Sequence, residues 1–323
     1  MTKLRKISQI TIHPRSPFHF DGTFHKPSHF PNRLQLDAWQ TGTYWQALRL
    51  QSGMYGIRVD DIGSFRKPAL RVKVFSKSKA TPKVLEELKR ELSWRFGFDE
   101  DLNDFIKLTK QDKRFSPVFR KWLGMRNMSQ FDLYGLLIIG VVLQNATVRR
   151  SAQMLDALLE KFGNKVQFDH KILYHIWKPE ALECVSEKQL RKLRIGYRAK
   201  FLKRLSRDFV KGKVDEQQLR ILDKEVAKQA LMQLYGVGPE TVRILLFESC
   251  RQYDTFDHIA PWQQKIYSRM FYNESLVSAD KIRRDICQQY GTYSMLAVHY
   301  IWEDLFWRRK HEHISWLEKE IRL

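Results

Sequence analysis

Short runs in the first quarter of the chain alternate apolar and polar residues, as β-strands with one buried face do. Runs of this kind lie at 9–12, 43–51, 54–59 and 69–75, and Gly, Asp and Pro separate them. Residues 16–20 form a further short run that Pro17 interrupts. The Gln51-Ser52-Gly53 stretch has the composition of a hairpin loop. The pattern therefore predicts antiparallel strands between residues 7 and 74.

The apolar period changes to three and four residues after Thr81-Pro82, a pair typical of a helix N-cap and first turn. A helix over 83–96 would carry one apolar face made of Val84, Leu85, Leu88, Leu92 and Phe96. From Phe98 to the C-terminus we expect helices alone, among them 131–143, 149–162 and 260–271. A sheet followed by helices predicts an α+β fold. We expect an antiparallel-sheet domain over residues 1–112 and a helical domain over 113–323.

Composition sets further limits on this 323-residue chain. Hydrophobic residues make up 43%, which favours a globular protein over a disordered one. Three distant cysteines (Cys184, Cys250 and Cys287) argue against both a disulfide framework and a Cys-x-x-Cys metal site. The N-terminal histidines are irregularly spaced, which disfavours a zinc site; they are His13, His19, His25 and His29.

The longest apolar run, residues 133–143, is too short to cross a bilayer, and no signal-peptide core follows Met1. We therefore expect an intracellular protein, cytoplasmic if its source is a prokaryote. Lys and Arg number 57 against 36 Asp and Glu, a net charge of +21 that favours a polyanionic partner. The basic residues are dispersed and form no basic amphipathic helix, so nucleic acid is favoured over a membrane surface.

A glycine pair separates two predicted helices in the stretch Leu234-Tyr-Gly-Val-Gly-Pro-Glu-Thr241. The first helix covers 226–234 and the second 241–247. Gly236 and Gly238 allow positive φ angles and a close approach of the backbone to a ligand. The second helix would point its free N–H groups and positive dipole end outward, which suits a phosphate.

This stretch resembles the L-x-G-V-G-x-x-T hairpin of the helix-hairpin-helix (HhH-GPD) DNA glycosylase superfamily. The resemblance implies that Gly236, Val237, Gly238 and Thr241 contact DNA. A catalytic Asp follows the hairpin in that superfamily, and Asp257 stands 19 residues after Gly238 (257 − 238 = 19). Asp254 is the nearest competitor. Asp257 is also placed to cap the helix over 260–271, and both roles can hold at once.

Two further motifs resemble 8-oxoguanine glycosylases. The Gly196-Tyr197-Arg198-Ala segment matches their Leu-Gly-Tyr-Arg-Ala, in which the Tyr wedges into the duplex and the Arg contacts the unpaired base. Gln144-Asn145 lies between two predicted apolar helices. In the superfamily, the matching passage between two helices faces the DNA at the flipped-out nucleotide. The resemblance implies that Asn145, Tyr197 and Arg198 contact DNA. The alternatives are a simple turn and a buried tyrosine.

The aromatic helix over 290–305 resembles the one that completes the base pocket in 8-oxoguanine and bacterial 3-methyladenine glycosylases. This resemblance implies that Tyr300 and Trp302 form walls of the base pocket. The alternative is that the aromatic residues simply pack in the hydrophobic core, as such stripes more often do. Residues 16–20 and 72–98 resemble the first domain of these enzymes, so the resemblance covers most of the chain.

One position departs from the family pattern. Bifunctional members carry a Lys two residues after the second glycine, where this chain has Glu240. A carboxylate cannot form an imine with the sugar, so we expect no strand cleavage. The resemblance implies a monofunctional DNA glycosylase that excises a damaged base, with an alkylated purine favoured, and Asp257 as its catalytic residue.

An 8-oxoguanine-type glycosylase and a non-catalytic damage-binding protein are the alternatives. The expected partner is double-stranded DNA carrying a damaged base, bound by a monomer away from membranes. No cofactor is expected, apart from the monovalent cation that hairpin carbonyls hold in relatives.

Overall fold

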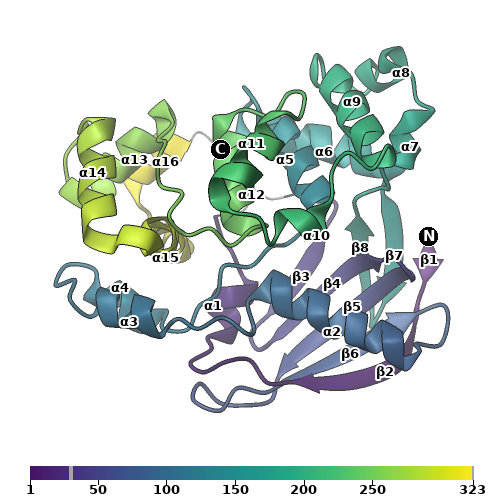
Figure 1. Ribbon diagram of the computed structural model, residues 1–323, viewed down its shortest axis with the longest axis horizontal. Helices are drawn as coiled ribbons and strands as arrows, with labels where there is room; N and C mark the ends of the chain where they lie inside the picture. Colours follow the sequence, from purple (N-terminus) through teal and green to yellow (C-terminus); the bar gives the residue numbers. More distant parts are fainter. Residues whose placement is uncertain (29–31, 322–323) are drawn as a thin grey trace.

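A computed structural model of the protein describes residues 1–28 and 32–321. Its main sheet has five antiparallel strands in the order β2-β6-β5-β4-β3 (Figure 1). These strands are β2 (Arg5–Ile12), β3 (Asp37–Gln40), β4 (Thr43–Leu50), β5 (Gly53–Asp61) and β6 (Leu70–Ser76). The hairpin expected at residues 51–53 is present, since Leu50 pairs with Gly53 across the β4–β5 turn. The α+β class is confirmed.

Helix α2 (Pro82–Phe96) covers one face of this sheet (Figure 1). Its start is as predicted, because the Thr81 hydroxyl accepts a hydrogen bond from the Val84 N–H at 3.4 Å. The apolar side of α2 is fully buried at Leu88, Leu92 and Phe96, which join Val59 and other strand residues in one core. The apolar spacing of the sequence thus decides which face of α2 meets the sheet.

The strand expected at residues 16–20 is wrong. The chain instead turns there into a short helix, α1 (Phe20–Phe24). His19 caps this helix, since its Nδ1 accepts from the Gly22 N–H at 3.0 Å. Phe18, Phe20 and Phe24 pack in the core beneath α2, so the apolar residues are buried as expected but from a helical turn.

The expectation of helices alone after Phe98 is also wrong. A second sheet, in the order β1-β7-β8, consists of β1 (Thr2–Lys3), β7 (Asn164–Phe168) and β8 (Lys171–His175). Asp169 and His170 connect β7 to β8 at φ angles of 45° and 63°, the geometry of a tight hairpin. Val166 and Phe168 pack against Trp45 on the main sheet. Because β1 pairs with β7, the chain's N-terminus joins both predicted domains, whose boundary at residue 112 remains a prediction.

Helices make up most of the remaining chain (Figure 1). They are α3 (Asn103–Thr109), α4 (Ser116–Lys121), α5 (Leu133–Leu143), α6 (Val148–Phe162), α7 (Glu180–Glu183), α8 (Glu187–Arg191), α9 (Arg198–Val210), α10 (Glu216–Leu219), α11 (Lys224–Met232), α12 (Pro239–Glu248), α13 (Pro261–Tyr272), α14 (Ala279–Tyr290), a short 3-10 helix at Gly291–Tyr293, α15 (Ser294–Arg309) and α16 (Ser315–Ile321). No helix in the described part of the chain combines the length and apolar character that a bilayer crossing requires.

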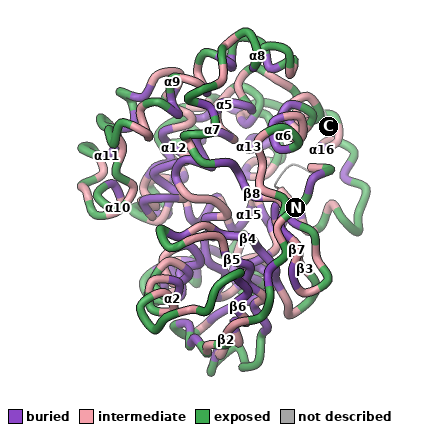
Figure 2. Tube along the Cα trace, turned by 90° about the vertical axis from the view of Figure 1, so that its right-hand side faces the viewer, coloured by how far each residue is buried: buried purple, intermediate pink, exposed green. Residues whose placement is uncertain are grey.

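Helix α5 lies at the centre of the helical region. Most of its residues are buried, and it shares one core with α6, α9, α11 and α12. A second core joins α13, α14 and α15 to α3 and α4. Figure 2 shows the buried stretches gathered along the middle of the molecule, with α10 and α11 at its edge. This arrangement fixes α11 and α12 against α5 and leaves the turn between them near the surface.

Candidate DNA interface and active site

The predicted helix-turn-helix is formed by α11 and α12, which lie on either side of residues 233–238. Leu234 and Val237 are buried in the core, so the turn is anchored from below. Gly236 has a φ of +84°, and a Cβ at this position would lie 2.7 Å from the Phe201 ring. A side chain at position 236 would therefore be strained, which favours glycine at this turn. The expectation of positive φ at Gly238 is wrong, because its φ is −105°.

The start of α12 has unpaired backbone donors. Gly238 is the N-cap and has no side chain with which to accept from the first N–H groups. Thr241 turns its methyl group toward α5, since a Cβ added at Gly140 would lie 2.8 Å from Thr241 Cγ2. The side chain of Thr241 is thus part of the helix packing, and the backbone of this first turn is what faces outward. Such a turn can bind a phosphate.

Asn145, Tyr197 and Arg198 come together as the sequence predicted. Asn145 Nδ2 donates to the Tyr197 hydroxyl at 3.3 Å. The Tyr197 side chain is 39% exposed, so the buried-tyrosine alternative is wrong. Arg198 is buried, and its guanidinium donates to the backbone oxygen of Gln144. In this state Arg198 supports the loop between α5 and α6 and does not reach outward.

Gln144 joins this group to the hairpin, a role that sequence reasoning missed. Its side-chain Nε2 donates to the Gly236 carbonyl oxygen at 2.6 Å. The polar Gln-Asn pair between two apolar helices was the available signal, but nothing in the sequence indicates the partner 92 residues away.

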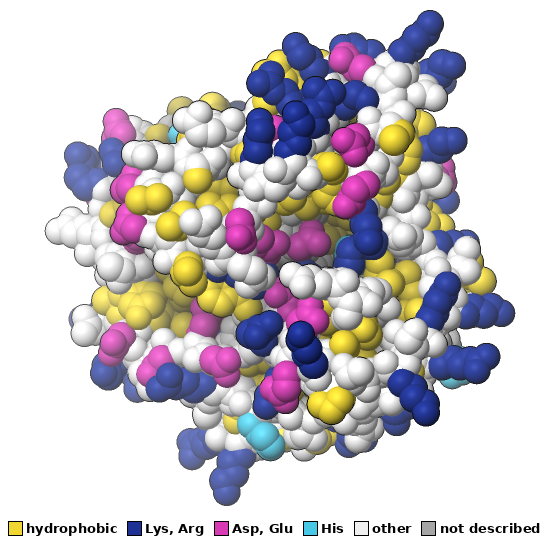
Figure 3. Space-filling view, turned by 45° about the vertical axis from the view of Figure 1, so that its right-hand side comes forward, with side chains coloured by type: hydrophobic (Ala, Val, Ile, Leu, Met, Phe, Trp, Pro, Cys, Tyr) yellow, Lys and Arg dark blue, Asp and Glu magenta, His cyan; other side chains and the backbone are white. Residues whose placement is uncertain are grey.

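Positive charge is concentrated beside Tyr197, so the expectation that the basic residues are dispersed is wrong for this part of the chain. The segment from α8 through α9, residues 187–210, carries nine Lys and Arg but only Glu187 and Asp208 as acids. Figure 3 shows Lys and Arg side chains gathered at the top of the molecule, where Figure 1 places α8 and α9. Lys200 and Arg204 stack over the ring of Tyr235 in the hairpin turn, 5.4 Å and 4.1 Å from its centroid. The basic segment and the hairpin thus form one continuous surface for a polyanion.

Asp257 lies in the loop between α12 and α13, against the first hairpin helix. Its carboxylate is 52% exposed and forms an ion pair with Lys228 of α11, with Nζ and Oδ2 3.3 Å apart. The predicted capping role is wrong, because α13 begins at Pro261 and Ala260 is its N-cap. The Asp257 carboxylate therefore does not cap α13.

Asp254, the competing carboxylate, also pairs with a lysine of α11, one helical turn before Lys228. Lys224 Nζ lies 2.7 Å from Asp254 Oδ2. This hydrogen bond raises the pKa of Lys224, opposed by partial desolvation. Asp254 is the less exposed of the two, 36% against 52% for Asp257.

Glu240 has a structural partner of its own. Its two carboxylate oxygens accept from Arg243 at 2.6 Å and 3.1 Å, and the Arg243 side chain is only 2% exposed. His258 Nε2 lies 3.9 Å from the same carboxylate. Glu240 therefore neutralises a buried cation, a requirement that a Lys at this position would not meet.

The known proteins that this chain resembles are DNA glycosylases. No protein-family model matches the chain. Over 168 residues it is 23% identical to a DNA-3-methyladenine glycosylase of Bacillus subtilis, a match that spans 51% of this chain and 55% of the relative. The chain therefore spans about half the length of that relative.

Two solved structures share the fold. An 8-oxoguanine glycosylase/lyase of Clostridium acetobutylicum aligns with a TM-score of 0.68 and 21% identity, covering 93% of this chain and 98% of that one. A 3-methyladenine DNA glycosylase of Archaeoglobus fulgidus aligns with a TM-score of 0.72 and 15% identity, covering 90% and 96%. The resemblance to helix-hairpin-helix DNA glycosylases is confirmed.

The two residues that this resemblance suggested for a base pocket lie in different surroundings. Tyr300 is 2% exposed, its hydroxyl donates to the Met125 carbonyl, and its ring packs 5.0 Å from Phe105. The expectation that Tyr300 forms a pocket wall is therefore wrong for this structure. Trp302 is partly exposed and lies 6.1 Å from Trp262, whose side chain is 52% exposed. Trp302 stays a candidate.

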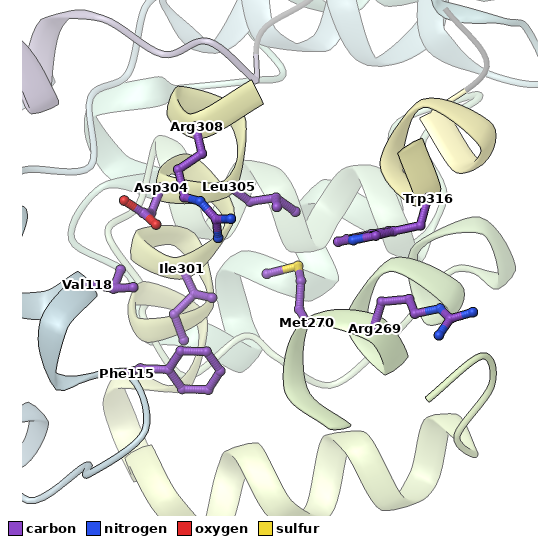
Figure 4. Close-up of a pocket in the computed structure, with 9 residues that line it drawn as sticks. All are labelled: Phe115, Val118, Arg269, Met270, Ile301, Asp304, Leu305, Arg308 and Trp316. Atoms are coloured by element: carbon purple, nitrogen blue, oxygen red, sulfur yellow. The ribbon is translucent and has the colours of Figure 1, made fainter. Parts of the chain in front are cut away.

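Two cavities lie away from Asp257. One, of about 220 Å³, lies between α4, α13, α15 and α16, with Phe115, Met270 and Trp316 around it and Arg308 at its side (Figure 4). The other, of about 240 Å³, is lined by Trp39, Trp122 and Trp307 together with polar side chains. Neither is lined by Tyr300 or Trp302, so neither is the pocket that the glycosylase resemblance implies.

The N-terminal histidines have separate environments. His19 caps α1, and the His25 ring stacks on Trp39 at 4.2 Å. His13 Nδ1 lies 3.4 Å from the Pro68 carbonyl oxygen, and His29 lies outside the described residues. Across residues 1–28 and 32–321, no three His, Cys, Asp or Glu side chains are grouped so as to hold a metal ion.

Proposed function

We propose that the protein is a DNA glycosylase that turns a damaged base out of the duplex and hydrolyses its N-glycosidic bond. One observation carries this proposal. The exposed carboxylate of Asp257 lies against α11, so a carboxylate without a capping role stands beside the hairpin that would bind the DNA backbone.

The chemistry follows from the charge that develops during cleavage. As the base leaves, C1′ of the sugar becomes oxocarbenium-like and positive. An ionised Asp257 next to C1′ stabilises that charge, and the same carboxylate orients and deprotonates the attacking water. The Tyr197 ring, exposed beside Asn145, fills the space that the base leaves in the stack.

We further propose that the enzyme hydrolyses without cutting the strand. The ion pair between Glu240 and Arg243 supports this, because it leaves no amine at the position where bifunctional relatives carry one. A carboxylate committed to a buried guanidinium cannot form an imine.

An alkylated purine is the substrate that we favour. The relative named a DNA-3-methyladenine glycosylase supports this choice, as do the partly exposed rings of Trp262 and Trp302, which could stack on an electron-poor base. An 8-oxoguanine-type activity is the second candidate, favoured by the grouping of Asn145, Tyr197 and Arg198 and opposed by Glu240. The proposed partner is duplex DNA, bound by a monomer, with a monovalent cation at the hairpin carbonyls as in relatives.

The test is an excision assay on duplexes that carry 3-methyladenine, 8-oxoguanine, uracil or an intact abasic site. Each reaction is read with and without alkali, using the wild type, Asp257→Asn and the matched variant Asp254→Asn. We expect base release from one lesion, breaks only after alkali, and loss of release in Asp257→Asn alone while DNA binding survives. Retained turnover in Asp257→Asn would remove this residue from the mechanism. Tight binding without release from any lesion would favour the non-catalytic damage-binding protein.

A further inference from the structure

Helix α11 presents two lysines, one turn apart, to the loop that carries both candidate carboxylates. Lys224 pairs with Asp254 at 2.7 Å, and Lys228 pairs with Asp257 at 3.3 Å. The Lys228 side chain is 39% exposed, and that of Asp257 is 52% exposed. The catalytic carboxylate of the proposed function is therefore half-exposed and paired with a cation in the DNA-free protein.

This ion pair is incompatible with the proposed chemistry. An ammonium within hydrogen-bonding distance of Asp257 would lie beside the positive C1′ of the transition state and repel it. The same ammonium would also weaken the field of the carboxylate. Lys228 must therefore leave Asp257 before the glycosidic bond breaks.

We propose that Lys228 is a DNA-phosphate ligand that exchanges Asp257 for a backbone phosphate when DNA binds, and so releases the carboxylate from its ion pair. This inference rests on the catalytic role proposed for Asp257. Lys228 lies on the first helix of the hairpin, whose turn faces outward, so bound DNA brings phosphates close to it. The flexible four-carbon stem of a lysine lets the ammonium change partners, and an ion pair this exposed opens at little cost.

A covalent role for Lys228 would differ from this one, because it requires the neutral amine to attack C1′. Lys224 provides the matched comparison, because it has the same side chain, lies on the same helix and pairs with a carboxylate outside the proposed mechanism.

The first test is the salt dependence of binding to a duplex that carries a tetrahydrofuran abasic analogue, which the enzyme cannot process. Each phosphate contact contributes about 0.9 to the slope of log K against log salt. We expect Lys228→Ala to lower the slope by about that amount, while Lys224→Ala keeps the wild-type slope and Lys228→Arg restores it. An unchanged slope in Lys228→Ala overturns the proposal.

A double-mutant cycle tests the exchange itself. Asp257→Asn frees Lys228 in advance, so we expect it to tighten binding by about two- to fivefold. In the Lys228→Ala background this gain should be smaller, because only the general loss of a negative charge remains. Equal gains in both backgrounds overturn the proposal. A covalent DNA adduct that borohydride traps in the wild type but not in Lys228→Ala would also overturn it. All binding arms are independent of turnover, so a failure to excise any lesion leaves this result readable.

Discussion

The side-chain amide of Gln144 donates a 2.6 Å hydrogen bond to the backbone oxygen of Gly236. The backbone oxygen of Gln144 accepts in turn from the Arg198 guanidinium and, at 3.4 Å, from the Tyr197 hydroxyl. One residue at the end of α5 thus fixes the hairpin turn relative to the tyrosine segment. DNA that contacts both must meet them at a set separation.

Replacing Gln144 by Ala should weaken DNA binding on any duplex, because the hairpin and the Tyr197 segment lose their common support. The Gly236 carbonyl also loses its donor, so the free energy of unfolding should fall by about 1 kcal/mol. Gln144→Glu serves as the control of equal size, and we expect the same losses because a carboxylate cannot donate. Urea denaturation and fluorescence anisotropy measure the two effects. Wild-type binding by both variants would mean that the link does not position the hairpin.

The two hairpin glycines should respond differently to alanine. At Gly236 the positive φ and the clash with Phe201 should cost roughly 1–3 kcal/mol of stability. A Cβ at Gly238 meets no atom within 4 Å, so Gly238→Ala should cost less than about 1 kcal/mol. It should nevertheless weaken DNA binding, because the added methyl occupies the space through which a phosphate approaches the α12 N-terminus. A Gly238→Ala protein that binds DNA normally would argue against this approach.

Local patterns predicted much of this molecule. The alternation in β4 and β5, the Thr81 cap of α2 and the glycine turn at Gly236 depend on residues close together in sequence, and all three are present. The β7–β8 hairpin was missed because each strand has only five residues, too few for alternation to outweigh the surrounding helical pattern. The turn at Asp169-His170 was the available signal.

The site was harder to predict because its contacts are long-range. Nothing near Arg198 in the sequence shows that its guanidinium is used by a backbone oxygen 54 residues away. Helix α15 is apolar on most sides, so the pattern could not decide whether Tyr300 faces a pocket or the core. The sequence could not indicate a role for Lys228 either, because that role depends on its contact with Asp257, 29 residues away.

A cluster of charged side chains around Lys26 predicts a pH-dependent stability. Lys26 Nζ donates to the carbonyls of Gly22 and Arg126, and Ser28 donates to Glu303. Desolvation, followed by repulsion from Glu303, raises the pKa of Glu248 from 4.5 to about 7. Desolvation lowers the pKa of Lys26 from 10.5 to about 8.

The folded protein therefore binds the Glu248 proton more tightly than the unfolded chain does, and stability should fall as pH rises from about 4.5 to about 7. Lys26 acts in the opposite direction at higher pH, since stability should recover as pH rises from about 8 toward 10.5. Glu248→Gln should reduce the fall between pH 5 and pH 7, as measured by urea denaturation, and the raised pKa values of Asp37 and Glu303 should keep part of it. Glu86→Gln, at an exposed position of α2, should leave it in place. The same fall in Glu248→Gln would assign the titration to another group.

Tyr197 should matter more for damaged than for intact DNA. An aromatic ring that fills the place of an extruded base stabilises only the flipped state. Tyr197→Ala should therefore weaken binding to an abasic duplex by a larger factor than binding to an undamaged one. Tyr197→Phe keeps the ring and loses only the two bonds of the hydroxyl, with Asn145 and with the Gln144 backbone oxygen, so it should retain most of the preference. Equal losses on both duplexes would mean that the ring contacts the outside of the helix.

Replacing Glu240 by the lysine that bifunctional enzymes carry at this position should destabilise the protein. Arg243 is almost fully buried and depends on Glu240 for its counter-charge. Glu240→Lys would leave the Arg243 guanidinium without a counter-charge and place a second positive charge beside it. The expected loss is about 3–5 kcal/mol in the free energy of unfolding. Glu240→Gln keeps an acceptor for Arg243 and should lose less, and Arg243→Met in the Glu240→Lys background should recover much of the stability because it removes the stranded charge. Urea denaturation of the four proteins, wild type included, measures this order. A Glu240→Lys protein as stable as the wild type would show that Arg243 has another partner, and the position could then accept an amine without further change.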